Sequence, residues 1–192
     1  MKTRVVFAAI AASAVFAAGA CADDEKGAVS STTVHDMDSM DDMDSMEDMN
    51  MGDPDATPAT EVDGADIKTA EFVVLDTRPE GFDAVVGEAA IARHDGGTTV
   101  TLDVAGLVPG ESYIAHLHDD VCAENGGAHY QFDPDGSEVP PNEIHLAFVA
   151  DADGNGFMTA ENAQVAGPDG VAMVVHPVEL IDNKIACAEF DA

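Results

Sequence analysis

The sequence predicts an all-β domain, an antiparallel sandwich or barrel, over residues 67–192. Three observations support this class. Apolar, often β-branched residues recur in short stretches, many of them alternating with polar residues. Gly, Pro, Asp and Asn separate the stretches, and none carries a convincing helical pattern. The segment has 126 residues, which is long enough to bury one hydrophobic core.

The expected strands follow one another with turn signals between them. There are eight, and in chain order they span Glu71–Asp76, Glu88–Arg93, Thr98–Val104, Ser112–Leu117, Ile144–Ala150, Gly156–Glu161, Val171–His176 and Lys184–Phe190. Residues 95–97, Asp-Gly-Gly, form a hairpin signal between the second and the third. Residues 151–156 between the fifth and sixth resemble the opening of a calcium loop. Asn162 stands at the twelfth position, however, and no helices flank the segment, so we expect a turn.

Residues 1–20 have the layout of a secretory signal peptide. Lys2 and Arg4 precede an apolar run from Val5 to Ala18, and small residues follow. The run is too short for a membrane span. Residues 18–21, Ala-Gly-Ala-Cys, resemble a bacterial lipobox, in which Cys21 would receive a lipid and anchor the protein to a membrane. We therefore expect an exported protein: a cell-envelope lipoprotein or, with ordinary cleavage nearby, a secreted one.

Residues 21–66 are expected to form a disordered, acidic tether, because they are poor in aromatic and branched residues. His35 is followed by a methionine repeat with a spacing of three and one further methionine: Met37, Met40, Met43, Met46, Met49 and Met51. Thioethers bind cuprous copper, so we expect the repeat to capture copper. The alternative is a solvated spacer whose methionines are incidental or are consumed by oxidants.

Acidic residues dominate the charge of the chain. Seven Lys and Arg against 38 Asp and Glu give a net charge of −31, and removal of Lys2 and Arg4 with the signal peptide makes it −33. Such a surface repels nucleic acid and acidic lipid, and it keeps the protein soluble. It also repels anionic substrates. Nucleic acid is therefore not expected as a partner.

The three cysteines are one in the expected lipobox, Cys21, and two in the expected β domain, Cys122 and Cys187. If Cys21 carries a lipid, Cys122 and Cys187 remain as a pair, and in an oxidising compartment such a pair can form a disulfide. Closing the loop of 65 positions between them would stabilise the fold by roughly 4 kcal/mol in the chain-entropy treatment. Two free buried thiols are the alternative.

Four of the seven histidines form a pattern typical of a metal site. His116 and His118 lie two apart on an expected strand, so both side chains share one face and can reach one ion. His129 and His176 are distant in sequence and complete the set. Four imidazoles without a thiolate favour copper, and zinc also remains open.

Residues 67–192 resemble the copper/zinc superoxide dismutase family. Five short pieces occur in the family's order: His116-Leu117-His118, Cys122 with Gly126 to Tyr130, Asp151 to Gly154, Met173 to His176, and Lys184 to Cys187. The resemblance implies an eight-stranded antiparallel Greek-key β-barrel or sandwich. It also implies a Cys122–Cys187 disulfide, superoxide as substrate, and one copper ion held by His116, His118, His129 and His176.

The chain departs from the family where a second metal would lie. In the family, the histidine at the position of His129 bridges copper to zinc, and the following loop supplies further zinc ligands. Residues 131–143 contain no histidine here, and only seven residues separate His176 from Lys184 where two-metal members carry a long loop. We therefore expect zinc to be absent, as in the copper-only branch. Glu143 is expected to accept a hydrogen bond from His129 and to fix its ring.

Lys184 stands where the family has an arginine three residues before its final cysteine. Lysine keeps the positive charge but lacks the planar fork of donors, so we expect it to attract superoxide and to orient it less well. The resemblance assigns the catalytic proton to His129. Reduced efficiency is expected, because the net charge also opposes an anionic substrate.

The sequence thus predicts an exported copper-dependent superoxide dismutase, which converts superoxide to oxygen and hydrogen peroxide. The methionine repeat and Lys184 favour a second hypothesis, a copper-binding or copper-buffering lipoprotein that reuses the fold. A third is a structural module with a vestigial site. The sequence predicts no oligomeric state, and it assigns His145 to the surface or to packing rather than to a metal.

Overall fold

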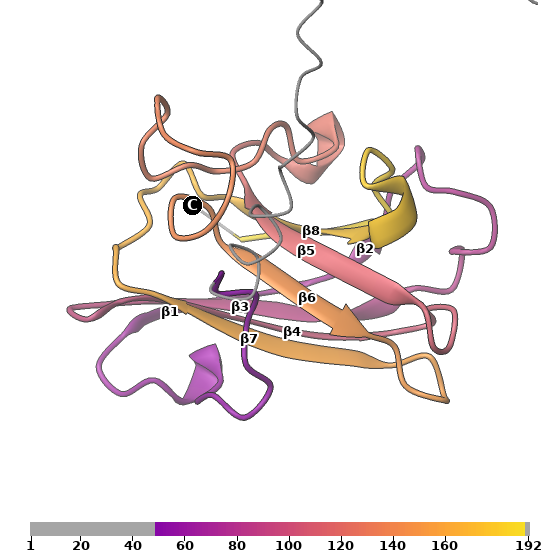
Figure 1. Ribbon diagram of the computed structural model, residues 1–192, viewed down its shortest axis with the longest axis horizontal. Helices are drawn as coiled ribbons and strands as arrows, with labels where there is room; N and C mark the ends of the chain where they lie inside the picture. The colour runs from indigo at the N-terminus through magenta and orange to yellow at the C-terminus, as the bar shows by residue number, and fades with distance from the viewer. Residues whose placement is uncertain (1–48, 191–192) are drawn as a thin grey trace, which may run out of the picture. The chain divides into compact units, whose positions relative to one another are not determined.

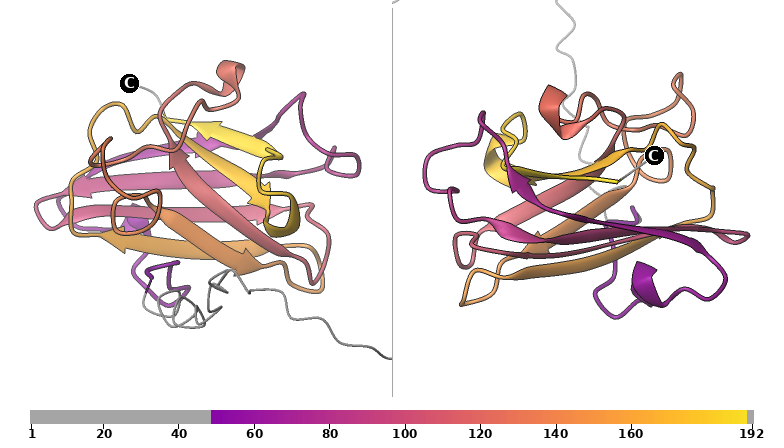
Figure 2. Two further views of the ribbon diagram at one scale, coloured as in Figure 1. Left: turned by 45° about the horizontal axis from the view of Figure 1, so that its top comes forward. Right: turned by 180° about the vertical axis from the view of Figure 1, so that it is seen from behind.

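Two antiparallel sheets form the domain, which the computed structural model describes from residue 49 to residue 190. The first sheet has the order β1 (Asp66–Glu71), β3 (Val86–His94), β4 (Gly97–Ala105) and β7 (Gly156–Asn162). The second has the order β2 (Val73–Val74), β9 (Ala186–Glu189), β8 (Ala172–Pro177), β5 (Ser112–His118) and β6 (His145–Val149). The sheets lie as two layers (Figure 1; Figure 2, right). Within the described range, helix is limited to three single 3-10 turns: η1 (Ala59–Glu61), η2 (Cys122–Glu124) and η3 (Val178–Leu180).

The connections between the sheets are of the Greek-key kind. After β5 and β6 have formed in the second sheet, β7 returns to the first and pairs with β4. β8 then crosses back and pairs with β5 on the side opposite β6. The all-β antiparallel fold expected from the alternating pattern is confirmed.

The first expected strand, Glu71–Asp76, is in fact divided between the two sheets. β1 begins at Asp66 and ends at Glu71, where it pairs with β3, and the two-residue β2 pairs with β9. Phe72 lies between them, is buried in the core and donates its N–H to the Gly87 carbonyl. The chain therefore changes sheet at Phe72, which gives nine strands between residues 49 and 190 rather than the eight expected.

Strict alternation along the second sheet separates the core from an outer histidine face. Core-facing side chains fill the space between the layers: Ala115 and Leu117 on β5, Leu146 and Phe148 on β6, Met173 and Val175 on β8, and Ala186 and Ala188 on β9. Because successive side chains on a strand point to opposite faces, the residues between them point away from the core. These are His116 and His118 on β5, His145 on β6, His176 on β8 and Cys187 on β9.

Residues 50–53 run between β6 and β7, which are edge strands of the two sheets. The Met51 carbonyl accepts the N–H of Ala147 on β6, and Asp53 donates its N–H to Thr159 on β7. Asn50 reaches the Glu161 carbonyl with its side chain. Further along, η1 packs through Ala59 against β3. This part of the expected tether is therefore ordered against the sandwich, because its backbone satisfies two otherwise open sheet edges.

Candidate metal centre

The outer face of the second sheet brings three histidines together by register alone. His116 and His118 lie two residues apart on β5, and β8 pairs beside it with His176 opposite Ile114. Residues that share a sheet face on neighbouring strands have their side chains within contact distance. These three histidines are almost completely buried, with 0 to 2% of their surface exposed.

The fourth histidine, His129, is brought back by a turn. Residues 119–128 reverse the chain, and His129 forms an isolated antiparallel bridge with His118. Gly126 and Gly127 have φ angles of 76° and 68°, and a Cβ at Gly127 would lie 2.5 Å from the Cβ of Asp120. Only glycine allows this return without strain. His129 is the most exposed of the four, with 32% of its side chain accessible.

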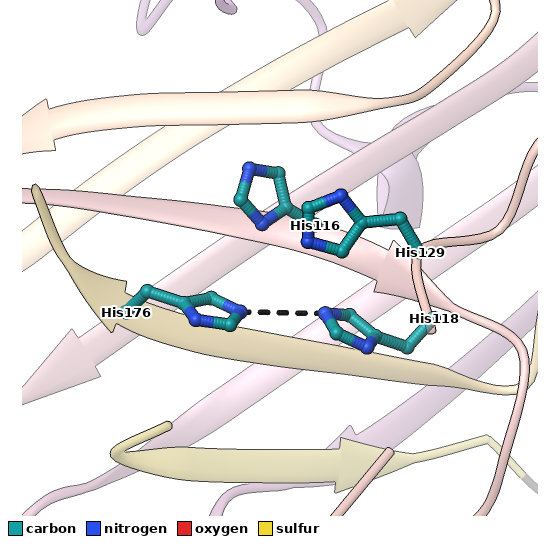
Figure 3. A group of neighbouring side chains, drawn as sticks. All are labelled: His116, His118, His129 and His176. Atoms are coloured by element: carbon teal, nitrogen blue, oxygen red, sulfur yellow. Dashed lines mark hydrogen bonds between the residues drawn. The ribbon is translucent and has the colours of Figure 1, made fainter. Parts of the chain in front are cut away.

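The four rings converge on one centre. One ring nitrogen of each of the four histidines lies within 4.8 Å of those of the others. His118 Nε2 and His176 Nε2 face each other at 3.3 Å, and the rings of His116 and His129 lie side by side with their centroids 4.0 Å apart (Figure 3). The structure thus assembles the four histidines that the sequence singled out.

Burial keeps the strand-borne rings neutral. Desolvation lowers the pKa of His118 to about 2, and the neighbouring imidazoles and Lys184 add to the effect. Desolvation also lowers the pKa of His176 to about 4, although hydrogen bonds to backbone carbonyls oppose the shift. The pKa of His116 falls for the same first reason. Neutral imidazoles are the form that binds metal ions.

A buried nitrogen of His116 shows that the rings fit an ion. Among the described residues, His116 Nδ1 and His118 Nδ1 are buried side-chain atoms without a hydrogen-bond partner. His176 donates from Nδ1 to the Ile181 carbonyl at 2.8 Å, so its Nε2 carries a lone pair directed at His118. Buried polar atoms without partners are costly, and an ion between the rings would satisfy His116 directly. The residues present therefore fit a metal ion.

A buried carboxylate holds the fourth ring. Glu143 Oε2 accepts a hydrogen bond from His129 Nδ1 at 2.8 Å, and the side chain of Glu143 is 1% exposed. Gln131 donates to the other oxygen, Oε1, at 2.9 Å. Asn142 closes the preceding loop through bonds to Asp133 and so fixes where Glu143 lies. The predicted Glu143–His129 contact is present in the structure.

One partner of Glu143 was not expected from the sequence. His145 donates from Nε2 to Glu143 Oε2 at 2.8 Å, and it is buried rather than on the surface. Burial raises the pKa of Glu143, but hydrogen bonds from His145, Gln131 and His129 outweigh it and lower the pKa overall. His129, Glu143 and His145 also lie close enough to form a second candidate ligand group. The alternation of β6 already places His145 on the histidine face, and this was the available sequence signal.

Lys184 lies beside the cluster and is held in place by backbone carbonyls. Its Nζ donates to Gly127 at 2.6 Å and to Asn125 at 2.9 Å. Burial lowers its pKa, which the nearby Asp119 opposes. The charge of Lys184 acts on both His118 and His176. The lysine therefore fixes the turn that carries His129 and places a positive charge next to the four rings.

The Cys122–Cys187 disulfide implied by the family resemblance is present. It joins η2, at the start of the returning turn, to β9, and the alternative of two free thiols is wrong. The Cys122 N–H also donates to the Glu189 side chain. The bond ties the loop that leads to His129 to the outer face of the second sheet.

Several sequence expectations fall outside the described residues. These are the signal peptide, Cys21, His35, Met37, Met40, Met43 and Met46. Met49 and Met51 lie within the described range and are partly buried where the chain joins the sandwich. Their part in copper capture stays a prediction. Among the described residues, none forms a helix of the length and apolarity that a bilayer span requires.

The fold and the site together define an all-β sandwich with a four-histidine candidate metal centre. No model of a known protein family matches the chain, and no curated protein matches it. Among solved structures, the chain is similar to a Cu/Zn superoxide dismutase from Brucella abortus, with 20% identity and a TM-score of 0.49 over 66% of this chain and 100% of that one. It is also similar to a mutant of the SOD-like protein from Bacillus subtilis, with 15% identity and a TM-score of 0.46 over 65% and 97%.

Proposed function

We propose that the chain is an exported, copper-dependent superoxide dismutase, which converts two superoxide ions and two protons into oxygen and hydrogen peroxide. The observation that carries this proposal is the convergence of four imidazoles around a centre where the buried His116 Nδ1 has no hydrogen-bond partner. A purely structural site would satisfy that nitrogen within the protein. A vestigial site would have no reason to keep all four rings directed at one centre.

The donor set favours copper over other metals. Four neutral nitrogens with neither thiolate nor carboxylate suit copper, whereas structural zinc sites commonly include cysteine. His116, His118, His129 and His176 would hold the ion. When bound, copper supplies the one-electron oxidation and reduction that dismutation requires. We further propose that zinc is not part of the centre.

We propose that His129 transfers the catalytic proton and that Glu143 fixes the tautomer and orientation of its ring. The bond from His129 Nδ1 to the carboxylate fixes the tautomer, so Nε2 carries the lone pair that faces the other three rings. As the most exposed of the four rings, His129 is also the one best placed to take a proton from solvent at Nε2 and pass it to the forming peroxide. Lys184 would attract the anionic substrate.

Metal-specific activity tests this proposal. The mature chain would be prepared metal-free, copper-loaded and zinc-loaded, and superoxide consumption would be measured by pulse radiolysis or stopped flow. We expect activity only with copper, and below the diffusion limit because the net charge of the chain opposes the anion. A copper-loaded protein that decays superoxide no faster than the metal-free form contradicts the proposal.

Glu143→Gln tests the proton-handling role. The substitution keeps the size of the side chain but loses the carboxylate charge that accepts from His129, so turnover and copper affinity should both fall, the latter by about 10- to 100-fold. Glu138→Gln is the matched control, because Glu138 is exposed and lines the same cavity of about 240 Å³ beside His129. If both variants retain wild-type turnover and copper affinity, Glu143 has no such role.

A second candidate function is copper binding or buffering by an envelope lipoprotein. The methionine repeat, a soft-ligand sequence next to the domain, specifically favours it. Copper-loaded protein that holds the ion tightly but lacks superoxide turnover would select this candidate. Replacing Met37, Met40, Met43 and Met46 with leucine and measuring cuprous affinity tests the repeat directly.

Export and anchoring belong to the same proposal. The disulfide is consistent with an oxidising compartment. We propose cleavage before Cys21 followed by acylation of that cysteine. Mass spectrometry of the mature N-terminus from the native host tests this, and an unmodified N-terminus in the culture medium would favour the secreted form instead.

A further inference from the structure

His145 is the fourth histidine that the strands of the second sheet place on its outer face. It is the first residue of β6 and lies directly opposite His116 on β5 in the antiparallel register. Opposite residues project from the same face, so the two rings meet edge to face with their centroids 4.4 Å apart. His145 is buried, with 8% exposed. It contacts a proposed copper ligand but does not belong to the four-ring group.

The hydrogen bonding of His145 is shared with the fourth ring of the cluster. Its Nε2 and the Nδ1 of His129 both lie 2.8 Å from one oxygen, Oε2 of Glu143. Gln131 holds the other oxygen. The carboxylate is therefore fixed by three donors, two from the segment of His129 and Gln131 and one from β6, and the two donors on Oε2 together set its direction.

We propose that His145 is a positioning residue, which orients Glu143 and through it the imidazole of His129. The inference deepens the proposed function and rests on it, because His129 is the ring proposed to carry the proton. Without the His145 bond, Oε2 would be held by His129 alone. The carboxylate and the ring would then turn as a pair, and the lone pair at His129 Nε2 would lose its fixed direction.

Hydrogen bonds set the direction of the buried carboxylate. A cavity of about 290 Å³ lies next to it, lined by Glu143 and His145 themselves together with Pro141, Ala160 and Asn162. A second cavity, of about 240 Å³, lies on the side of His129 and Gln131. The Glu143 side chain is 1% exposed, so its oxygens lie between these two hollows and face their three donors rather than solvent. This is why the N–H of His145, rather than the bulk of its ring, carries the positioning role.

Two substitutions separate the N–H from the ring. His145→Phe keeps an aromatic ring against His116 and loses the donor, whereas His145→Gln loses the ring and keeps an N–H that can reach Oε2. His145→Leu is a second variant without the donor and of lower bulk, and His94→Gln, at the β3–β4 hairpin, is the control. Each full-length chain would be loaded with Cu(II), and its EPR spectrum, reduction potential and copper affinity would be measured. Thermal unfolding of the metal-free forms would report on folding.

We expect His145→Phe and His145→Leu to shift the copper hyperfine splitting and the reduction potential in the direction of Glu143→Gln, and to lower copper affinity by about tenfold. His145→Gln should restore values within about twofold of wild type. Equal changes in all three variants, or none in the two that lack the donor, would overturn the positioning role. So would a second metal bound stoichiometrically by the wild type and lost on changing His145.

These readouts do not depend on turnover. Suppose that His145→Phe and His145→Leu change the copper properties and His145→Gln restores them, but wild-type protein consumes no superoxide. The positioning role then stands and the dismutase function fails. If wild-type protein is active and the three His145 variants do not differ from one another in their copper properties, the function stands and the positioning role fails.

Discussion

The strand-held part and the loop-held part of the histidine cluster are built differently. His116, His118 and His176 come from paired strands, and the register of β5 with β8 is enough to bring them together. His129 comes from a returning turn, and it depends on two glycines, a disulfide at the turn's start and a buried carboxylate. The first three rings are buried, while His129 reaches solvent.

We propose that this difference separates holding an ion from turning over a substrate. Rings fixed by a sheet cannot move without breaking the fold, so they suit permanent ligands. A ring on a turn, oriented by hydrogen bonds, can exchange protons with solvent. The comparison predicts that damage to the strand-held part abolishes metal binding, whereas damage to the loop-held part first affects turnover.

The largest effect is expected from removing one ring of each kind. Loss of a hydrogen-bond partner of a metal ligand lowers metal affinity by up to roughly 100-fold. His118→Ala should lower copper affinity by more than this, because a direct and buried ligand is lost. His129→Ala should lower copper affinity less, since water can take its place at the exposed side, but it should abolish turnover. Competition with a chromophoric chelator measures the affinities, and His94→Ala is the control. Equal losses of affinity would end the distinction between the two parts.

Loss of the disulfide should loosen the loop-held part and leave the strand-held part intact. Replacing Cys122 and Cys187 with serine removes the constraint on a separation of 65 residues, which costs about 4 kcal/mol of unfolding free energy in the chain-entropy treatment. Guanidinium unfolding with and without the bond measures this cost. Copper binding by the folded double variant should persist, and its loss together with the disulfide would show that the turn also secures the strand-held ligands.

The sequence predicted the strand-held part well, for a physical reason. Side chains two apart on a strand share a face, so the spacing in His116-Leu117-His118 was enough to indicate a paired site. His129 and His176 were added to that pair as candidates, but their convergence could not be derived from spacing, because both are distant in sequence and the path of the turn depends on long-range contacts. The Glu143 carboxylate contacts His129 across a loop that Asn142 closes through its bonds to Asp133.

Three features could not be predicted because local patterns do not record them. The alternation around Phe72 continues across the change of sheet, so one expected strand became two. Residues 50–53 bind open sheet edges through their backbone, which composition does not indicate. The partnership of His145 with Glu143 requires the pairing of β5 with β6, and a single histidine in a strand does not reveal its neighbour.

Acid should destabilise the metal-free protein through the strand-held rings. The unfolded chain takes up protons near pH 6.5, whereas burial lowers the pKa of His176 to about 4 in the folded state. Between these values the unfolded chain binds more protons, so stability falls as the pH is lowered from about 6.5 to about 4. His176→Gln should remove up to about 3 kcal/mol of this dependence. Urea unfolding across this range tests it, with His94→Gln as control, and identical slopes for wild type and His176→Gln would contradict the assignment.

The smallest effect concerns the charge beside the cluster. With a net charge of −31 on the whole chain, screening should relieve the repulsion of superoxide, so turnover should rise as ionic strength increases. Lys184→Gln should lower the rate by about tenfold at low salt, the lower end of the range for electrostatic steering, while Lys184→Arg should preserve it.

Lys184 is bound to the Asn125 and Gly127 carbonyls, so a loosened turn would also change copper affinity, and measuring this affinity is the control. A wild-type rate that falls with salt would mean that the local field of Lys184, beside the turn that carries His129, outweighs the total charge.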